Sequence, residues 1–157
     1  MRDAFGGIVN ITTIVVFLVI VSGYLAFNVS YTKAFRVKNK IITTIEQYEG
    51  KCGSESTAGK DCDTAIATYI KDVGYSPKTF KADDTKCKPI HQPTDSDGYY
   101  IGKCQADKVS SGSIDDNQKY YYKVETAIDI SIPIINDILA KIPDLRLKGN
   151  TKLITEK

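Results

Sequence analysis

The residues best suited to covalent or metal chemistry are four cysteines, Cys52, Cys62, Cys87 and Cys104. Zinc and redox sites need close pairs such as C-x-x-C, whereas successive cysteines here are 10, 25 and 17 positions apart. An even number of cysteines in a small, membrane-tethered domain favours two disulfides, formed in an oxidising compartment. Of the three possible pairings we favour Cys52–Cys62 and Cys87–Cys104, because both close short local loops around polar segments.

Other residue types offer little chemistry. His91 lies in a polar segment flanked by prolines, which predicts a solvated surface residue. The sequence DSDG at 95–98 is similar to part of a calcium loop but lacks its further acidic ligands, so we predict a turn into a strand. Motifs of phosphate-binding, zinc-protease or serine-hydrolase sites do not occur. We therefore expect no catalytic residue, no metal and no cofactor, and predict that the protein is not an enzyme.

Acidic pairs occur in two predicted loops and are interpreted as solvating charge. They are Asp83–Asp84 and Asp115–Asp116.

The segment that must position everything else is an apolar run at residues 6–27, inside a stretch (4–32) without any charged residue. A helix of this length rises about 1.5 Å per residue and crosses a hydrocarbon core of about 30 Å. A cleaved signal peptide has a shorter apolar region and a clearer small-residue cleavage site. We therefore predict that residues 1–30 form a retained, single-pass transmembrane anchor in contact with membrane lipid.

Small, polar and aromatic residues in this anchor are candidates for contact with a neighbouring helix. Alternatively, its serine and threonine hydroxyls bond back to their own helix, and the sequence leaves both possibilities open. The candidates are Asn10, Thr13, Phe17, Ser22, Gly23 and Phe27.

Residues 31–157 are predicted to form one α+β domain. The net charge of +2 is too small to favour nucleic-acid binding. The anchor helix is expected to continue to Glu49 and to stop at Gly50, because its second half carries one apolar stripe. The stripe consists of Tyr31, Ala34, Phe35, Ile41, Ile42, Ile45 and Tyr48.

The rest of the domain is predicted as a short helix and an antiparallel sheet. Asp61 or Asp63 is expected to cap the helix, which ends at Gly74, and residues 75–98 are interpreted as an irregular loop. Strands are expected at 99–105 and 120–132. The second alternates apolar and polar residues, which indicates one buried and one solvated face.

Beyond this strand we predict a short helix that begins at Pro133 and ends at Pro143. A final strand follows, in which Leu145, Leu147 and Leu153 alternate with basic residues and Gly149 introduces a bulge or turn. The apolar face of the sheet needs a cover, and the stripe of the first helix supplies it.

The charges and the cysteines disagree about membrane topology. Basic residues at 33, 36, 38 and 40 follow the anchor, and the positive-inside rule would keep the domain in the cytoplasm. Disulfides require the opposite side. Because long domains translocate against this bias, we place the domain outside the membrane.

A membrane helix that runs unbroken into a domain helix covered by an antiparallel sheet resembles type IV pilins and pseudopilins. The order of elements in 122–154 (strand, proline-led apolar helix, returning strand) is similar to TadE-like minor pilins of tight-adherence (Flp-type) pili. The resemblance implies a bacterial protein of the cytoplasmic membrane. It also implies a role in assembling a pilus or secretion pseudopilus, with other pilin-like subunits or copies of itself as partners. The alternative is a membrane-tethered module that binds a ligand or a surface.

Prepilins are cut after a glycine, which suggests Gly6 or Gly7 as a leader-cleavage site. Many of them carry a glutamate at the fifth mature position, where this chain would have Ile11 or Thr12. This departure leaves cleavage open, and the alternative is that both glycines only begin the membrane helix.

Overall fold

The computed structural model describes residues 2–53, 57–82, 86–94, 96–106, 119–128 and 145–155. These described residues form two helices and an antiparallel sheet, which confirms the predicted α+β fold class. The elements are α1 (Arg2–Gln47), α2 (Thr57–Val73), β1 (Cys87–His91), β2 (Tyr99–Gln105), β3 (Lys119–Ala127), β4 (Arg146–Asn150) and β5 (Ile154–Thr155).

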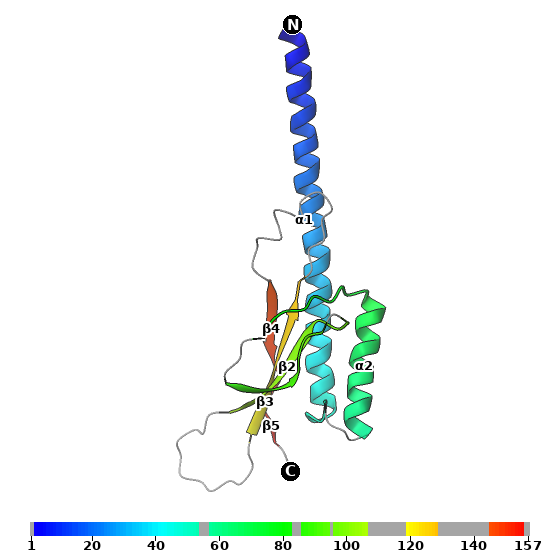
Figure 1. Ribbon diagram of the computed structural model, residues 1–157, viewed down its shortest axis with the longest axis vertical. Coiled ribbons are helices and arrows are strands. Elements are labelled where there is room, and N and C mark those ends of the chain that lie inside the picture. The colour runs from blue at the N-terminus through cyan, green and yellow to red at the C-terminus, as the bar shows by residue number, and fades with distance from the viewer. Residues whose placement is uncertain are drawn as a thin grey trace.

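Helix α1 is continuous over 46 residues, as the sequence predicts. Its first half projects from the domain as a stalk, and its second half lies against the sheet beside α2 (Figure 1). The helix ends at Gln47, because Glu49 and Gly50 adopt left-handed φ values of +51° and +77° and the Gly50 amide donates to the Ile45 carbonyl at 2.9 Å. A glycine in this left-handed conformation is a frequent helix terminator.

The sheet has the order β1-β2-β3-β4, and β5 also pairs with β3. All pairs are antiparallel, and β3 lies at the centre with neighbours on both sides. The predicted strand at 99–105 is confirmed as β2. The prediction of a loop at 75–98 is partly wrong, because this segment contains β1. The sequence of β1 is polar and contains a proline, which is tolerated in an edge strand but does not predict one.

The main core lies between one face of the sheet and the two helices. The α1 residues Ala34, Ile41 and Ile45 are buried there, which confirms the central part of the predicted stripe. Tyr31 and Phe35 are instead 41% exposed, so the predicted stripe is too wide. The covered face of α1 is narrower than the apolar one, because the sheet contacts only one side of the helix.

The second face of β3 is less solvated than its alternation predicts. Glu125 and Ala127, both assigned to the wet face, are 2% and 1% exposed. A small second cluster of Phe80, Tyr100 and Ala127 covers this face, and three basic side chains surround Glu125. The sheet is therefore covered on both sides around the end of β3.

Two further predictions need correction. Helix α2 begins at Thr57, so Asp61 and Asp63 lie inside it and do not cap it. The last strand is divided into β4 and β5 by residues 151–153, and not at Gly149 as predicted, because Gly149 lies inside β4 and pairs regularly with Val124. Leu153 is 58% exposed instead of buried, because it lies in this interruption.

The predicted helix between Pro133 and Pro143 lies outside the described residues. So do residues 129–132 of the strand predicted at 120–132, and the acidic pairs Asp83–Asp84 and Asp115–Asp116.

Candidate functional site

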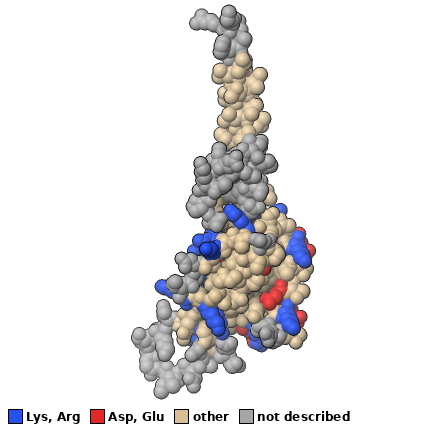
Figure 2. Space-filling view, in the orientation of Figure 1, with Lys and Arg blue, Asp and Glu red and all other residues tan. Residues whose placement is uncertain are grey.

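The apolar half of α1 is the most unusual surface of the molecule. Most of its large apolar side chains from Ile8 to Val29 are between 37% and 66% exposed, on all sides of the helix, and Val19 and Phe27 are half-buried. Figure 2 shows the described part of this stalk without basic or acidic side chains. Among the described residues, α1 is the one helix long and apolar enough to cross a membrane.

The residues predicted to contact a neighbouring helix all lie on this stalk. Thr13 donates to the Val9 carbonyl at 2.9 Å and Ser22 to the Leu18 carbonyl at 2.8 Å, so both hydroxyls bond back to their own helix. Asn10 and Phe17 are exposed, whereas Gly23 and Phe27 are half-buried. The stalk therefore offers a largely apolar surface, on which the hydroxyls of Thr12, Thr13 and Ser22 already donate to backbone carbonyls of the same helix.

The two candidate cleavage positions, Gly6 and Gly7, both lie inside α1, four and five residues after its first residue. A side chain at Gly7 would meet nothing within 4 Å, so close packing inside this chain does not require glycine there.

Two disulfides hold the domain together, with the pairing that the sequence favours. Cys52–Cys62 joins the turn after α1 to α2, and Cys87–Cys104 joins directly paired residues of β1 and β2. All four cysteines are buried. Each disulfide closes a short loop, and loops of this size typically contribute about 2–3 kcal/mol to the free energy of unfolding.

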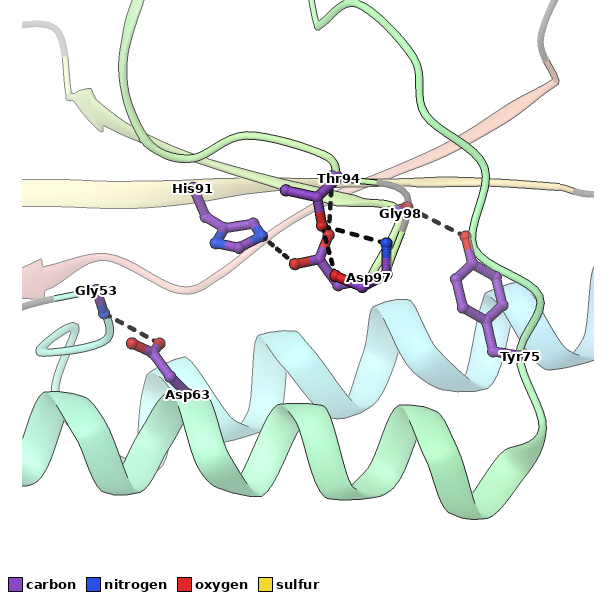
Figure 3. Close-up of polar contacts among 8 residues, drawn as sticks. Gly53, Asp63, Tyr75, His91, Thr94, Asp97 and Gly98 are labelled. Atoms are coloured by element: carbon purple, nitrogen blue, oxygen red, sulfur yellow. Dashed lines mark hydrogen bonds and ion pairs between the residues drawn. The ribbon is translucent and has the colours of Figure 1, made fainter.

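His91 is not the solvated loop residue that the sequence predicts. It lies in β1, its Nε2 is 2.9 Å from Asp97 Oδ2, and its ring stacks on Tyr99 with centroids 4.2 Å apart. Asp97 Oδ1 also accepts the Thr94 amide at 2.9 Å, which forms the predicted turn into β2 (Figure 3). The signal missed in the sequence is the six-residue spacing of His91 and Asp97 across this turn.

Tyr99 is 4% exposed and lies between the helices and the sheet. Burial raises the pKa of its phenol well above its usual value of about 10, and the negative charges of Asp97 and Asp63 raise it further. Tyr99 is thus held in its neutral form as part of the core.

The same turn is fixed to the end of the sheet by Tyr75. Its buried hydroxyl lies 2.7 Å from the Ala127 carbonyl and 3.2 Å from the Gly98 carbonyl (Figure 3). Gly98 has a φ of +57°, and a Cβ there would lie 2.7 Å from the backbone nitrogen of Lys78. Gly98, at the end of the loop before β2, is therefore closely packed against Tyr75 and Lys78, which fits a structural role of the His91–Asp97 pair.

A cleft of about 600 Å³ is lined in part by the turn after α1. This turn lies at the end of the domain farthest from the stalk (Figure 1). The walls of the cleft come from the turn after α1 and from the sheet, and Tyr122 donates to the Gly50 carbonyl at 2.9 Å in its floor. The cleft is not visible in the amino-acid sequence, because the segments that line it are brought together only by the fold. The lining residues are Glu49, Gly50, Lys51, Cys52, Gly53, Ile90, Lys103, Tyr122, Ile154 and Thr155.

Within the described part of the chain, no group of three potential metal ligands comes together. A scan of protein-family models found no match to the chain, and neither did searches of curated proteins and of solved structures.

Proposed function

We propose that this protein is a non-enzymatic, pilin-like subunit that assembles a bacterial pilus or secretion pseudopilus. In this proposal α1 holds the protein in the cytoplasmic membrane as a single pass, and the disulfide-bonded domain lies outside. The apolar stalk packs against the same helix of other pilin-like subunits or of further copies.

One observation carries the proposal: a single unbroken helix is apolar and exposed in its first half and forms part of the domain core in its second. Burying apolar surface contributes about 25 cal/mol per Å², so such a stalk is stable only in lipid or against other apolar helices. Because the helix is continuous, a contact along the stalk also positions the domain. A flexible tether would not transmit that position.

A photo-crosslinking experiment tests the assembly. A photoreactive phenylalanine at Phe17, which is 63% exposed, should crosslink full-length protein in bacterial membranes to a second copy or to a pilus component. The matched control places the same group at Thr43, which is exposed on the domain half of α1. Mass spectrometry of the unreduced protein additionally reports whether the chain is cut at Gly6 or Gly7.

Protein adducts at position 17 that are absent at position 43 would support assembly through the stalk. If position 17 and further positions around the stalk, such as Ile14 and Ile20, give lipid adducts alone, the stalk is a simple anchor and the assembly proposal fails.

The cleft favours a second function, a tethered module that binds a ligand or surface. Its volume lies in the range of small-molecule sites, about 300–1,000 Å³. Ligand-observed NMR with a fragment library and full-length protein in nanodiscs would test this. Binding should be lost in Ile90→Trp, which fills the cleft, and retained in the stalk variant Phe17→Leu. Equal binding to both variants, or none to the native protein, would contradict it.

A further inference from the structure

A row of aromatic side chains marks the place where the stalk becomes the domain. The rings of Phe27 and Tyr31 lie 6.2 Å apart, and those of Tyr31 and Phe35 lie 6.4 Å apart at an angle of 12°. The ammonium group of Lys38 lies 4.5 Å from the centre of the Phe35 ring. Spacings of three and four residues put these side chains on one face of α1.

This face stays outside the core although it is aromatic. Tyr31 and Phe35 are each 41% exposed, although Ala34, which directly precedes Phe35, is fully buried. The stem of Lys38 lies over β4, since a Cβ at Gly149 would be 3.2 Å from Lys38 Cδ. The row of aromatic side chains therefore contacts the domain at the Lys38 end, whereas Tyr31 and Phe35 remain accessible.

Basic side chains surround the helix at the same level. Lys33 donates to the Gly74 carbonyl at 3.0 Å, on the side of α2, while Arg36 is exposed. From position 4 to position 45 the chain contains no acidic residue. Figure 2 shows basic side chains where the domain meets the stalk.

The length of the stalk sets the depth of these residues. Residues 8–29 rise about 32 Å, which matches a hydrocarbon core of about 30 Å with a slight tilt. Tyr31 then lies about 3 Å and Arg36 about 10 Å beyond its edge. This is the layer of lipid headgroups, where aromatic rings and snorkelling basic side chains are favoured.

We infer that Tyr31, Lys33, Phe35, Arg36 and Lys38 form a collar that binds the headgroups of anionic phospholipids. The rings sit at the ester and glycerol level, and the cations contact lipid phosphates. Attraction between these cations and anionic headgroups falls off within a Debye length of about 10 Å, so the collar holds the domain close to the surface instead of letting it stand off. The inference depends on the membrane placement in the proposed function but not on assembly.

The absence of tryptophan makes the collar measurable. Phe35→Trp introduces a single fluorophore into the full-length protein, and Thr43→Trp is the matched control eight residues farther along α1. Both are reconstituted in vesicles of phosphatidylcholine alone or mixed with phosphatidylglycerol. A headgroup-labelled nitroxide lipid is the quencher.

We expect quenching of Phe35→Trp to be at least about twice that of Thr43→Trp, and to increase with phosphatidylglycerol. Changing Lys33, Arg36 and Lys38 together to glutamine should remove the lipid dependence. None of these three residues belongs to the buried stripe, and near-ultraviolet circular dichroism verifies that the fold survives the loss of the Lys33 and Lys38 contacts with the domain.

Three results would overturn the collar. The first is equal quenching of the Phe35→Trp and Thr43→Trp proteins. The second is quenching of the Phe35→Trp protein that does not change when phosphatidylglycerol is added. The third is blue-shifted, unquenched fluorescence from the Phe35→Trp protein, which would mean that another protein copy covers the face. If the stalk gives no protein crosslinks but the quenching is as expected, the assembly proposal is wrong and the collar is still supported.

Discussion

The two halves of α1 have the same secondary structure and opposite surroundings. Ile8, Ile11 and Ile14 are 53–65% exposed, while Ile41 and Ile45 are at most 1% exposed. Both halves are rich in the same residue type, so side-chain chemistry alone does not distinguish them. The distribution of polar residues does: the stalk is apolar on all sides, whereas the domain half carries lysine, arginine and asparagine on its outer side. Uniform apolarity requires lipid or other helices, and one-sided apolarity requires a sheet.

The largest expected effect is a difference in the free energy of unfolding between one substitution in the domain half of α1 and one in the stalk. Ile41→Ala removes a buried side chain between helix and sheet and should lower the free energy of unfolding of the domain by about 2–5 kcal/mol. Ile14→Ala, in the stalk, should change it by less than about 0.5 kcal/mol. Chemical unfolding of full-length protein in detergent, followed by near-ultraviolet circular dichroism, measures both. Equal losses would mean that the stalk is part of the same folding unit.

A second prediction concerns the Cys52–Cys62 disulfide, which joins the turn after α1 to α2. Replacing Cys52 and Cys62 with serine frees the turn after α1 from α2 and should lower the free energy of unfolding by about 2–4 kcal/mol. The same unfolding assay measures it, with reduction of the native protein as an independent comparison. Unchanged stability would show that packing of Ile66 and Ile70 against α1 already holds α2 in place.

A third prediction tests the covered second face of β3. Glu125 is 2% exposed and lies 3.1–3.4 Å from the charged groups of Lys123, Arg146 and Lys148. Glu125→Gln keeps the shape but removes the charge that these cations face. It should cost about 1–2 kcal/mol, a modest value because the three cations are partly solvated.

The matched control is Glu49→Gln. Glu49 pairs with Lys51 at 3.6 Å, but its side chain is 77% exposed, so the change should be nearly neutral. A neutral Glu125→Gln would show that the cluster does not stabilise the sheet.

The smallest expected effect is a pH dependence from Tyr99. Its pKa is raised in the folded protein, so the neutral phenol is favoured by folding. This contribution is complete below the unfolded value of about pH 10 and is lost as the pH rises above it, by about 1.4 kcal/mol at pH 11. The difference in stability between native protein and Tyr99→Phe, measured from pH 8 to 11, isolates it. A difference that stays constant over this range would contradict the assignment.

Local patterns predicted most elements. The unbroken run of helix-compatible residues up to Glu49 predicted α1, and Gly50 predicted its end. The alternation around Tyr122 and Val124 predicted β3. The edge strand β1 was missed, because pairing with β2 and a disulfide, and not its own sequence, make it a strand.

Of the two candidate sites, one could be predicted from local sequence and the other could not. The stalk was visible in the sequence, since apolarity over consecutive residues is a local property. The cleft was not, because Gly53 and Ile90 come from separate segments. A Cβ at Gly53 would collide with Ile90 Cγ2, so the glycine is explained by a contact that only the fold creates.

The amino-acid sequence by itself determined that one long helix is apolar first and amphipathic afterwards, because hydrophobic periodicity acts along a single helix. Only the tertiary structure decided which aromatic residues of that helix enter the core. Ala34 is enclosed and Phe35 is left outside because the sheet covers one side of α1 and no more. That choice depends on the orientation of two packed surfaces, which no single segment encodes.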